Sequence, residues 1–118
     1  MTMQPSSIAE YFVKKMNERH ATDTSYGVYQ CFGVEAGRKY DRIVNMEAPS
    51  SEPQNAKSKS VHAFIERETG ALIKSAGWRS PQKNSDGTLA VRFSMLSDAD
   101  VDAVVALSDR YGSYLYER

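Results

Sequence analysis

One segment of the chain, residues 61–78, restricts the possible folds more than any other. Two runs rich in β-branched and aromatic residues flank a short polar turn that ends at Gly70. Glycine readily adopts the positive φ angle that many tight turns require. The pattern therefore predicts a β-hairpin, with strands at residues 61–65 and 71–78.

The length of this turn predicts which residues of the hairpin share a face. A three-residue loop places Ile65 opposite Ile73 and Phe64 opposite Lys74, whereas a register shifted by one residue reverses the faces. The predicted core face carries Val61, Ala63, Ile65 and Ile73. The predicted outward face carries His62, Phe64, Lys74 and Trp78.

Two helices are predicted from capping residues and from apolar residues at helical spacing. Ser7 and Glu10 have the spacing of a capping box, and the apolar residues that follow predict a helix that ends near His20. Ser97 is the expected N-cap of a second helix, which we expect to stop near Gly112.

The rest of the chain alternates between strand patterns and polar connections. The segment 48–60 contains two prolines and no large apolar residue, which is typical of an exposed, mobile loop that either has no role or closes over a ligand. The element order is α-β-β-β-β-β-α-β, so we expect an α+β fold in which two helices cover a mostly antiparallel sheet of about five to six strands. The further predicted strands are 26–34, 38–47, 89–95 and 113–117.

The composition fits a single domain that spans residues 1–118. Hydrophobic residues make up 41% and charged residues 25% of the chain, close to the averages of globular proteins. A formal net charge of zero argues against duplex nucleic acid or an anionic membrane as partner. Cys31 is the only cysteine, which fits a reducing cytosol. We expect no signal peptide and no transmembrane helix, since no run approaches about 18 apolar residues.

The sequence shows no arrangement typical of a catalytic site. His20 and His62 lie in different predicted elements, and no Ser-His-Asp set, phosphate-binding glycine loop or paired-histidine metal motif is present. Asp98 and Asp102 belong to an acidic cluster that fits the start of a helix better than a metal site. We therefore expect a protein that is not an enzyme and that holds no cofactor and no metal.

Aromatic and cationic side chains gather in and near the predicted hairpin. Rings stack on bases, arginine stacks or forks onto phosphate and lysine supplies a point charge, so this combination suits a nucleotide or a single strand. An ordinary interpretation is equally open, in which Trp78 covers the core at a sheet edge with Lys74 and Arg79 as solvated neighbours. The candidate ligand-binding residues are His62, Phe64, Lys74, Trp78, Arg79, Lys83 and Arg92.

Two further groups have more than one interpretation. Arg38, Lys39 and Arg42 form a second basic group, which fits a solvated strand face better than a binding site. The tyrosine-rich segment 111–116 fits either another stacking surface or a subunit interface, because tyrosine serves both purposes.

The hairpin region also carries a family resemblance. The run SVHAFI at residues 60–65 is followed by a TG turn, then by Lys74 and a W-x-x-P step at 78–81. This pattern, together with the upstream segment 37–44, resembles a family of small bacteriophage proteins. The resemblance covers roughly half of the chain.

Among phage proteins, the functional group that this chain resembles most is the Thoeris anti-defence type of sponge. The resemblance implies a protein in the cytoplasm of the infected bacterial host that captures a cyclic ADP-ribose-like or cyclic oligonucleotide signal without cleaving it. It also implies a homo-oligomer with pockets near subunit contacts, where rings stack on adenine and arginines hold phosphates. By residue type, the resemblance adds Arg110 to the candidates and assigns this role to Phe64, Trp78, Arg79 and Arg92.

Two other functions are compatible with the sequence. A single-stranded nucleic-acid-binding module of phage metabolism would use the same rings and cations. The neutral net charge favours a small anionic ligand over a long nucleic acid, in which many phosphates must be neutralised. A protein inhibitor of a host enzyme would instead use the segment 111–116 as its interface. No membrane partner is expected.

Overall fold

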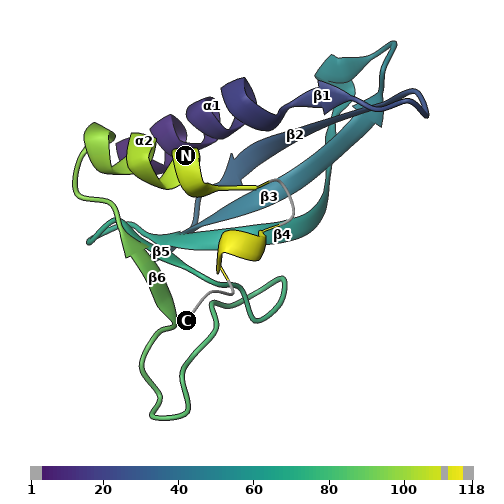
Figure 1. Cartoon of the computed structure of the whole chain (residues 1–118). Coiled ribbons are helices and arrows are strands. Elements are labelled where there is room, and N and C mark those ends of the chain that lie inside the picture. Colours follow the sequence, from purple (N-terminus) through teal and green to yellow (C-terminus); the bar gives the residue numbers. More distant parts are fainter. Residues whose placement is uncertain (1–3, 110–111, 116–118) are drawn as a thin grey trace.

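A curled sheet of six antiparallel strands forms the centre of the molecule, with two helices side by side on one face (Figure 1). The computed structural model describes residues 4–109 and 112–115. The strands follow one another in the sheet in chain order, β1-β2-β3-β4-β5-β6. This confirms the predicted α+β fold class. None of the helices in the described part of the chain is long and apolar enough to cross a membrane.

The elements have the following bounds. The helices are α1 (Ser7–His20) and α2 (Asp98–Leu107), and two short 3-10 helices are η1 (Pro53–Asn55) and η2 (Ser113–Leu115). The strands are β1 (Thr22–Asp23), β2 (Val28–Glu35), β3 (Tyr40–Pro49), β4 (Lys57–Glu66), β5 (Ala71–Ile73) and β6 (Val91–Ser94).

Both helices begin at a serine cap. The N-cap of α1 is Ser6, one residue before the predicted one, and its Oγ accepts a hydrogen bond from the backbone N of Ala9 at 3.2 Å. Ser97 caps α2 as predicted, by accepting from the N of Asp100. α2 ends at Leu107, several residues before the predicted stop, because the backbone at Ser108 is extended.

The main core lies between the helices and the sheet. Phe12 and Met16 of α1 and Val101 of α2 are fully buried against the sheet residues Ile43 and Ile65. Phe12 and Met16 lie four residues apart, which places both on the face of α1 that contacts the sheet.

The β4–β5 hairpin has a register that differs by one residue from the predicted one. Phe64 pairs with Ile73 and Ile65 with Leu72, because the loop has four residues rather than three. The N of Gly70 closes the loop by donating to the carbonyl of Glu66 at 2.8 Å. Gly70 has a φ of 74°, and a Cβ there would lie 2.0 Å from the carbonyl oxygen of Met95, so this position requires glycine.

This shift exchanges the faces of β5. Leu72 now belongs to the main core, while Ile73 shares the opposite face with Phe64 and Ala71. The prediction that Ile73 lies on the main-core face is therefore wrong. β5 also ends at Ile73, five residues before the predicted end of the return strand.

His62 is an extra residue in a β-bulge. Ala63 pairs with Ile43, and Val61 pairs with Val44, which leaves His62 without a partner in β3. A bulge turns the extra side chain out of the regular alternation. His62 is buried beside Phe32 on the helix-covered face, and Val61 joins Phe64 on the other face, so the predicted faces of both residues are wrong.

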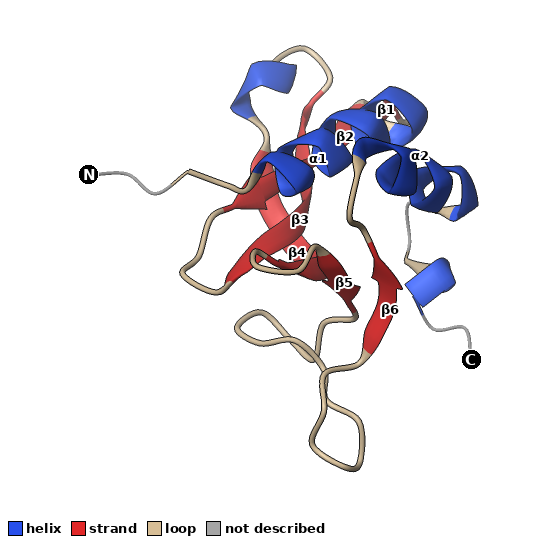
Figure 2. Cartoon of the chain, turned by 90° about the vertical axis from the view of Figure 1, so that its left-hand side faces the viewer, coloured by secondary structure: helices blue, strands red, loops and turns tan. Residues whose placement is uncertain are grey.

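Three further segments differ from the expectation based on the sequence. The segment 48–60 is largely exposed, as predicted, but β3 extends to Pro49 and β4 starts at Lys57, so only residues 50–56 connect the two strands. Residues 113–115 form the 3-10 helix η2 where a strand was predicted, and residues 116–117 lie outside the described part. Figure 2 shows the long connection from β5 to β6, residues 74–90, extending below the sheet.

Candidate functional site

An arginine lies between two aromatic rings on the face of the sheet that the helices leave uncovered. The guanidinium carbon of Arg42 is 5.9 Å from the ring centroid of Phe64 and 5.2 Å from that of Trp78. We call these three residues the Arg42 stack. Strand pairing explains half of it, because Arg42 and Phe64 are direct cross-strand partners in β3 and β4. Planar guanidinium groups favour such stacking over aromatic faces.

The backbone of the β5–β6 connection brings Trp78 to this position. Ser75 bridges to Pro81, and the N of Ala76 donates to the carbonyl of Ser80 at 3.0 Å, so Trp78 stands at the tip of a tight turn. The carbonyl of Trp78 in turn accepts a 2.7 Å hydrogen bond from Nε of Arg42. Arg42 therefore holds this turn by a stacked ring and by a hydrogen bond.

Arg42 also forms an ion pair within the sheet. One of its terminal nitrogens lies 2.8 Å from Oε1 of Glu35. The second carboxylate oxygen of Glu35 accepts a 2.9 Å hydrogen bond from Oγ of Ser58 on β4. The side chains of Arg42 and Glu35 are 25% and 40% exposed, so both partners of this pair are within reach of a solute.

A cavity of about 230 Å³ opens beside the Arg42 stack, and we call it the Arg42 cavity. Four cationic side chains and a single carboxylate line it, which makes it electropositive. In the described part of the chain, the side chains of Arg38 and Arg79 form no hydrogen bond and no ion pair. The lining residues are Glu35, Ala36, Gly37, Arg38, Lys39, Tyr40, Arg42, Phe64 and Arg79.

The β2–β3 turn positions two of these cations. Arg38 and Lys39 are exposed at its tip, and Nζ of Lys39 lies 5.6 Å from the ring centroid of Tyr40. A side chain at Gly37 would place its Cβ 2.5 Å from the carbonyl oxygen of Tyr40, so the turn is tight. The N of Arg67 also donates to the carbonyl of Lys39 at 3.0 Å, which ties this turn to the β4–β5 hairpin.

The structure brings together some of the residues proposed from the sequence. Phe64 and Arg79 line the Arg42 cavity, and Trp78 lies beside it in the stack. Phe64 is itself buried at 3% exposure, so it forms the floor of the stack rather than an open stacking surface. Lys74 lies at the base of the β5–β6 connection, where its carbonyl accepts from the N of Gln82.

Other proposed residues lie elsewhere. Lys83 is exposed farther along the β5–β6 connection, where it bridges to Leu89. Arg92 on β6 donates through Nε to the carbonyl of Leu115, and so holds η2. His62 is buried on the opposite face of the sheet, and Arg110 lies outside the described residues.

The residues that the sequence interpretation undervalued are the second basic group and Glu35. Arg38, Lys39 and Arg42 were assigned to a solvated strand face, yet all three line the Arg42 cavity. The sequence placed Arg42 and Phe64 on consecutive predicted strands, but only the structure shows the register that makes them direct partners. Nothing in the sequence pattern pointed to Trp78 folding back onto Arg42.

Two polar side chains, His62 and Tyr114, are buried next to each other on the helix-covered face. A ring nitrogen of His62 lies 2.8 Å from the hydroxyl of Tyr114, and both side chains are buried. Burial lowers the pKa of His62 to about 4 and raises the pKa of Tyr114 well above its usual range. In the described part of the chain, no three His, Cys, Asp or Glu side chains gather as a metal site would require.

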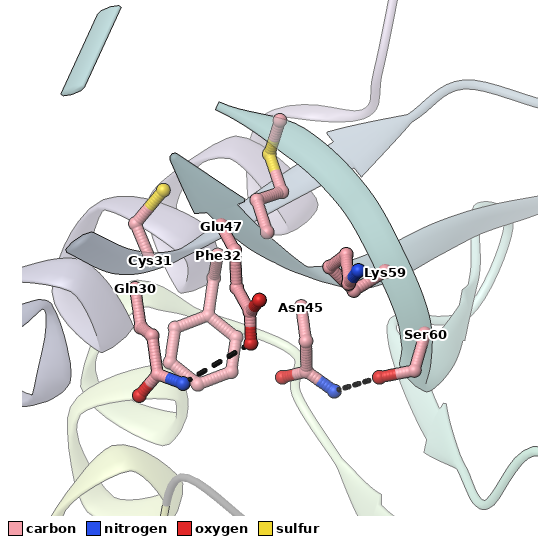
Figure 3. A pocket seen from close by; sticks show the side chains of 8 residues that line it. Gln30, Cys31, Phe32, Asn45, Glu47, Lys59 and Ser60 are labelled. Atoms are coloured by element: carbon pink, nitrogen blue, oxygen red, sulfur yellow. Dashed lines mark hydrogen bonds between the residues drawn. The ribbon is translucent and has the colours of Figure 1, made fainter. Parts of the chain in front are cut away.

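A second cavity, of about 290 Å³, lies near the other end of β2, β3 and β4. Its polar side chains bond to one another: Gln30 donates to Glu47, and Asn45 donates to Ser60 (Figure 3). Lys59 and Glu47 are its charged lining residues, so the two signs balance. An anion therefore gains less there than in the Arg42 cavity.

Comparison with known proteins identifies one family. A family model described as a family of unknown function, DUF7717, matches residues 3–117, which is nearly the whole chain. No curated protein and no solved structure matches the chain.

Proposed function

Because the chain belongs to the DUF7717 family, a family of unknown function, we propose its function from the geometry of the Arg42 stack and the Arg42 cavity, which we together call the Arg42 site. The protein binds a small anionic ligand that carries an aromatic ring, of the nucleotide class, and releases it unchanged. The observation that carries this proposal is the Arg42 stack at the wall of an electropositive cavity.

The two parts of a nucleotide match two parts of the site. Phosphate oxygens match Arg38 and Arg79, whose guanidinium groups present several donors in a plane. The cavity volume of about 230 Å³ is below the range of pockets that enclose whole ligands, roughly 300–1,000 Å³. The base therefore lies outside the cavity, where Trp78 is 45% exposed and offers a ring for stacking.

The charge balance of the chain supports a small ligand over a polymer. The formal net charge is zero, while the cations of the Arg42 cavity are concentrated at one turn and one loop. Two or three arginines suffice for one or two phosphates, whereas a long strand requires many neutralised phosphates.

The finer form of the proposal rests on the sequence resemblance. In that form, the ligand is a cyclic ADP-ribose-like or cyclic oligonucleotide immune signal, and a homo-oligomer of the protein sequesters it in the cytoplasm of an infected bacterium. The Arg42 site supports only the ligand chemistry of this proposal, namely phosphate with an aromatic base.

Native mass spectrometry of the freshly purified protein tests the proposal directly, because it measures the oligomer and any bound ligand together. Heating the sample and analysing the released compound separates binding from catalysis. We expect an intact phosphorylated compound with a nucleobase. A chemically altered compound would contradict release without reaction.

A titration with AMP or ADP, followed by the fluorescence of Trp78, localises the site, since Trp78 is the only tryptophan of the sequence. We expect Arg42→Gln to weaken binding and the control Arg92→Gln, whose arginine holds η2, to leave it unchanged. Equal affinities for both variants would contradict the assignment of the site. Binding of a single-stranded oligonucleotide alone, with a steep dependence on salt, would favour the nucleic-acid module instead.

A further inference from the structure

We infer that Glu35 is a built-in competitor that occupies Arg42 until the anionic group of a ligand displaces it. This inference rests on the proposed function and specifies how the site selects its ligand. Glu35 is the only carboxylate that lines the Arg42 cavity in the described part of the chain, and it lies 2.8 Å from the guanidinium group of Arg42.

The geometry places Glu35 where a phosphate oxygen would bind. Arg42 uses Nε for the carbonyl of Trp78, so its terminal nitrogens are the donors that remain for an anion. One of these already bonds to Glu35. An incoming phosphate must therefore exchange places with the carboxylate or share the guanidinium group with it. In the latter case the two negative charges repel each other.

The exposure of the pair allows this exchange. Both side chains are partly exposed, at 25% for Arg42 and 40% for Glu35, and exposed ion pairs contribute little to stability. The neighbouring pair Arg67–Asp41 is different, because the Asp41 side chain is 0% exposed and no solute can reach it. Displacement is thus available at Arg42 and unavailable at Arg67.

Ser58 adds a second contact that keeps the carboxylate in place when no ligand is bound. Its Oγ donates to the other oxygen of Glu35 at 2.9 Å, so the carboxylate is held from two sides. A ligand with one negative charge only replaces the charge that Glu35 already supplies. A ligand with two or more charges supplies an excess, so the site selects diphosphates and phosphate dianions over uncharged nucleosides.

The test compares adenosine, AMP and ADP as probes for the wild type, Glu35→Gln and Glu47→Gln. Glutamine at position 35 keeps an oxygen that can accept from Arg42 and removes the charge. Glu47 accepts from Gln30 and lies outside the Arg42 cavity, so its variant is the matched control for the same change in net charge.

We expect Glu35→Gln to tighten ADP binding roughly three- to tenfold, AMP binding less, and adenosine binding not at all, in line with the strength of a partly exposed charge pair. Thermal stability of the unliganded variant should stay equal or fall slightly, so the gain in affinity should come without a gain in stability. Structural damage would lower both.

A double mutant shows whether Glu35 acts through Arg42. We expect the gain from Glu35→Gln to disappear in the Arg42→Gln background. Two outcomes would contradict the role of Glu35 as a competitor and leave the proposed function intact. In the first, the wild type binds ADP and Glu35→Gln binds it no more tightly. In the second, Glu47→Gln increases the affinity for ADP as much as Glu35→Gln does. If neither the wild type nor Glu35→Gln binds any of the probes, both the proposed function and the role of Glu35 are contradicted.

Discussion

On the helix-covered face of the sheet, Asp41 is fully buried, and its carboxylate lies 2.6 Å from Arg67 and 3.0 Å from the N of Ser6. On the opposite face, the next residue along β3, Arg42, carries a partly exposed pair with Glu35 beside an open cavity. The two adjacent residues point to opposite faces because side chains alternate along a strand. The difference teaches that burial separates the charges that are enclosed in the fold from the charges that solvent and solutes can reach.

The same contrast holds for the uncharged polar groups. On the helix-covered face, His62 and Tyr114 bond to each other, both are buried, and the ring of Phe32 packs against that of His62. On the opposite face, Trp78 is nearly half exposed although it stacks on Arg42. Changes on the first face should therefore affect mainly stability, and changes on the second mainly binding.

The largest effect is expected for Asp41→Ala, which leaves Arg67 and the start of α1 without their carboxylate. Breaking a buried ion pair from one side typically costs about 3–5 kcal/mol. Urea denaturation followed by circular dichroism measures this loss in the free energy of unfolding. Asp102→Ala, which removes an exposed hydrogen bond from Tyr11, is the control and should cost less than about 1 kcal/mol. If both variants lose the same free energy of unfolding, the buried carboxylate of Asp41 contributes no more to stability than the exposed one of Asp102.

The second effect is a dependence of stability on pH that comes from His62. Its pKa is lowered from 6.5 to about 4, mainly by burial, with a smaller opposing effect from Asp109 and an added lowering from His20. Between these two values the unfolded chain binds a proton that the folded protein does not, so stability falls as the pH falls. The loss approaches about 3 kcal/mol at pH 4, and stability is fully present above pH 6.5.

His62→Gln isolates this contribution, because glutamine can still bond to Tyr114 but does not titrate in this range. The difference in unfolding free energy between the wild type and the variant should shrink as the pH is lowered from 7 to 4. Carboxylates that titrate in the same range cancel in this difference. A constant difference would show that the pKa of His62 is the same in the folded and the unfolded state.

On the opposite face, Arg42→Gln should weaken binding of ADP at least tenfold, which corresponds to about 1.4 kcal/mol. Its effect on unfolding should remain near 1 kcal/mol, because the pair with Glu35 is partly exposed. Isothermal titration calorimetry and urea denaturation measure the two quantities on the same sample. A large loss of stability with unchanged affinity would reverse the roles of the two faces.

The smallest effect is expected for Trp78→Ala. Removing one stacked ring costs about 1 kcal/mol of binding, the lower end of the range for base stacking. Stability should barely change. Calorimetry is required here, because the variant lacks the fluorophore. Tyr26→Ala, which removes a 90% exposed ring from the β1–β2 turn, is the matched control and should leave affinity unchanged.

The comparison of the two faces also shows where sequence interpretation succeeds. The serine cap of α2, the end of α1 near His20 and the hairpin turn at Gly70 were predicted from local patterns, and the structure confirms them. These features depend on residues close in sequence, so periodicity and capping suffice to predict them. The prediction of a strand at residues 113–115 was wrong, because an alternating pattern of only a few residues also fits one turn of 3-10 helix.

The residues of the candidate site were predicted only in part, because they come from distant segments of the chain. Trp78 and Arg79 were chosen for their residue types, while Arg42 was dismissed as a solvated residue of a strand. Arg42 lies 36 residues from Trp78 in the chain, and their hydrogen bond depends on how the β5–β6 connection folds back. No local pattern encodes that contact.

By itself, the sequence determined the α+β class, the two helices and the approximate positions of the main strands, because these follow from short-range propensity and apolar periodicity. Only the tertiary structure decided the faces. The β4–β5 loop has one residue more than predicted, which places Ile73 on the face away from the main core. The bulge in β4 directs the side chain of His62 toward the helix-covered face. Since side chains alternate with a period of two, each single-residue change exchanges the faces of a strand, and a pattern read along one strand does not specify the register with its neighbour.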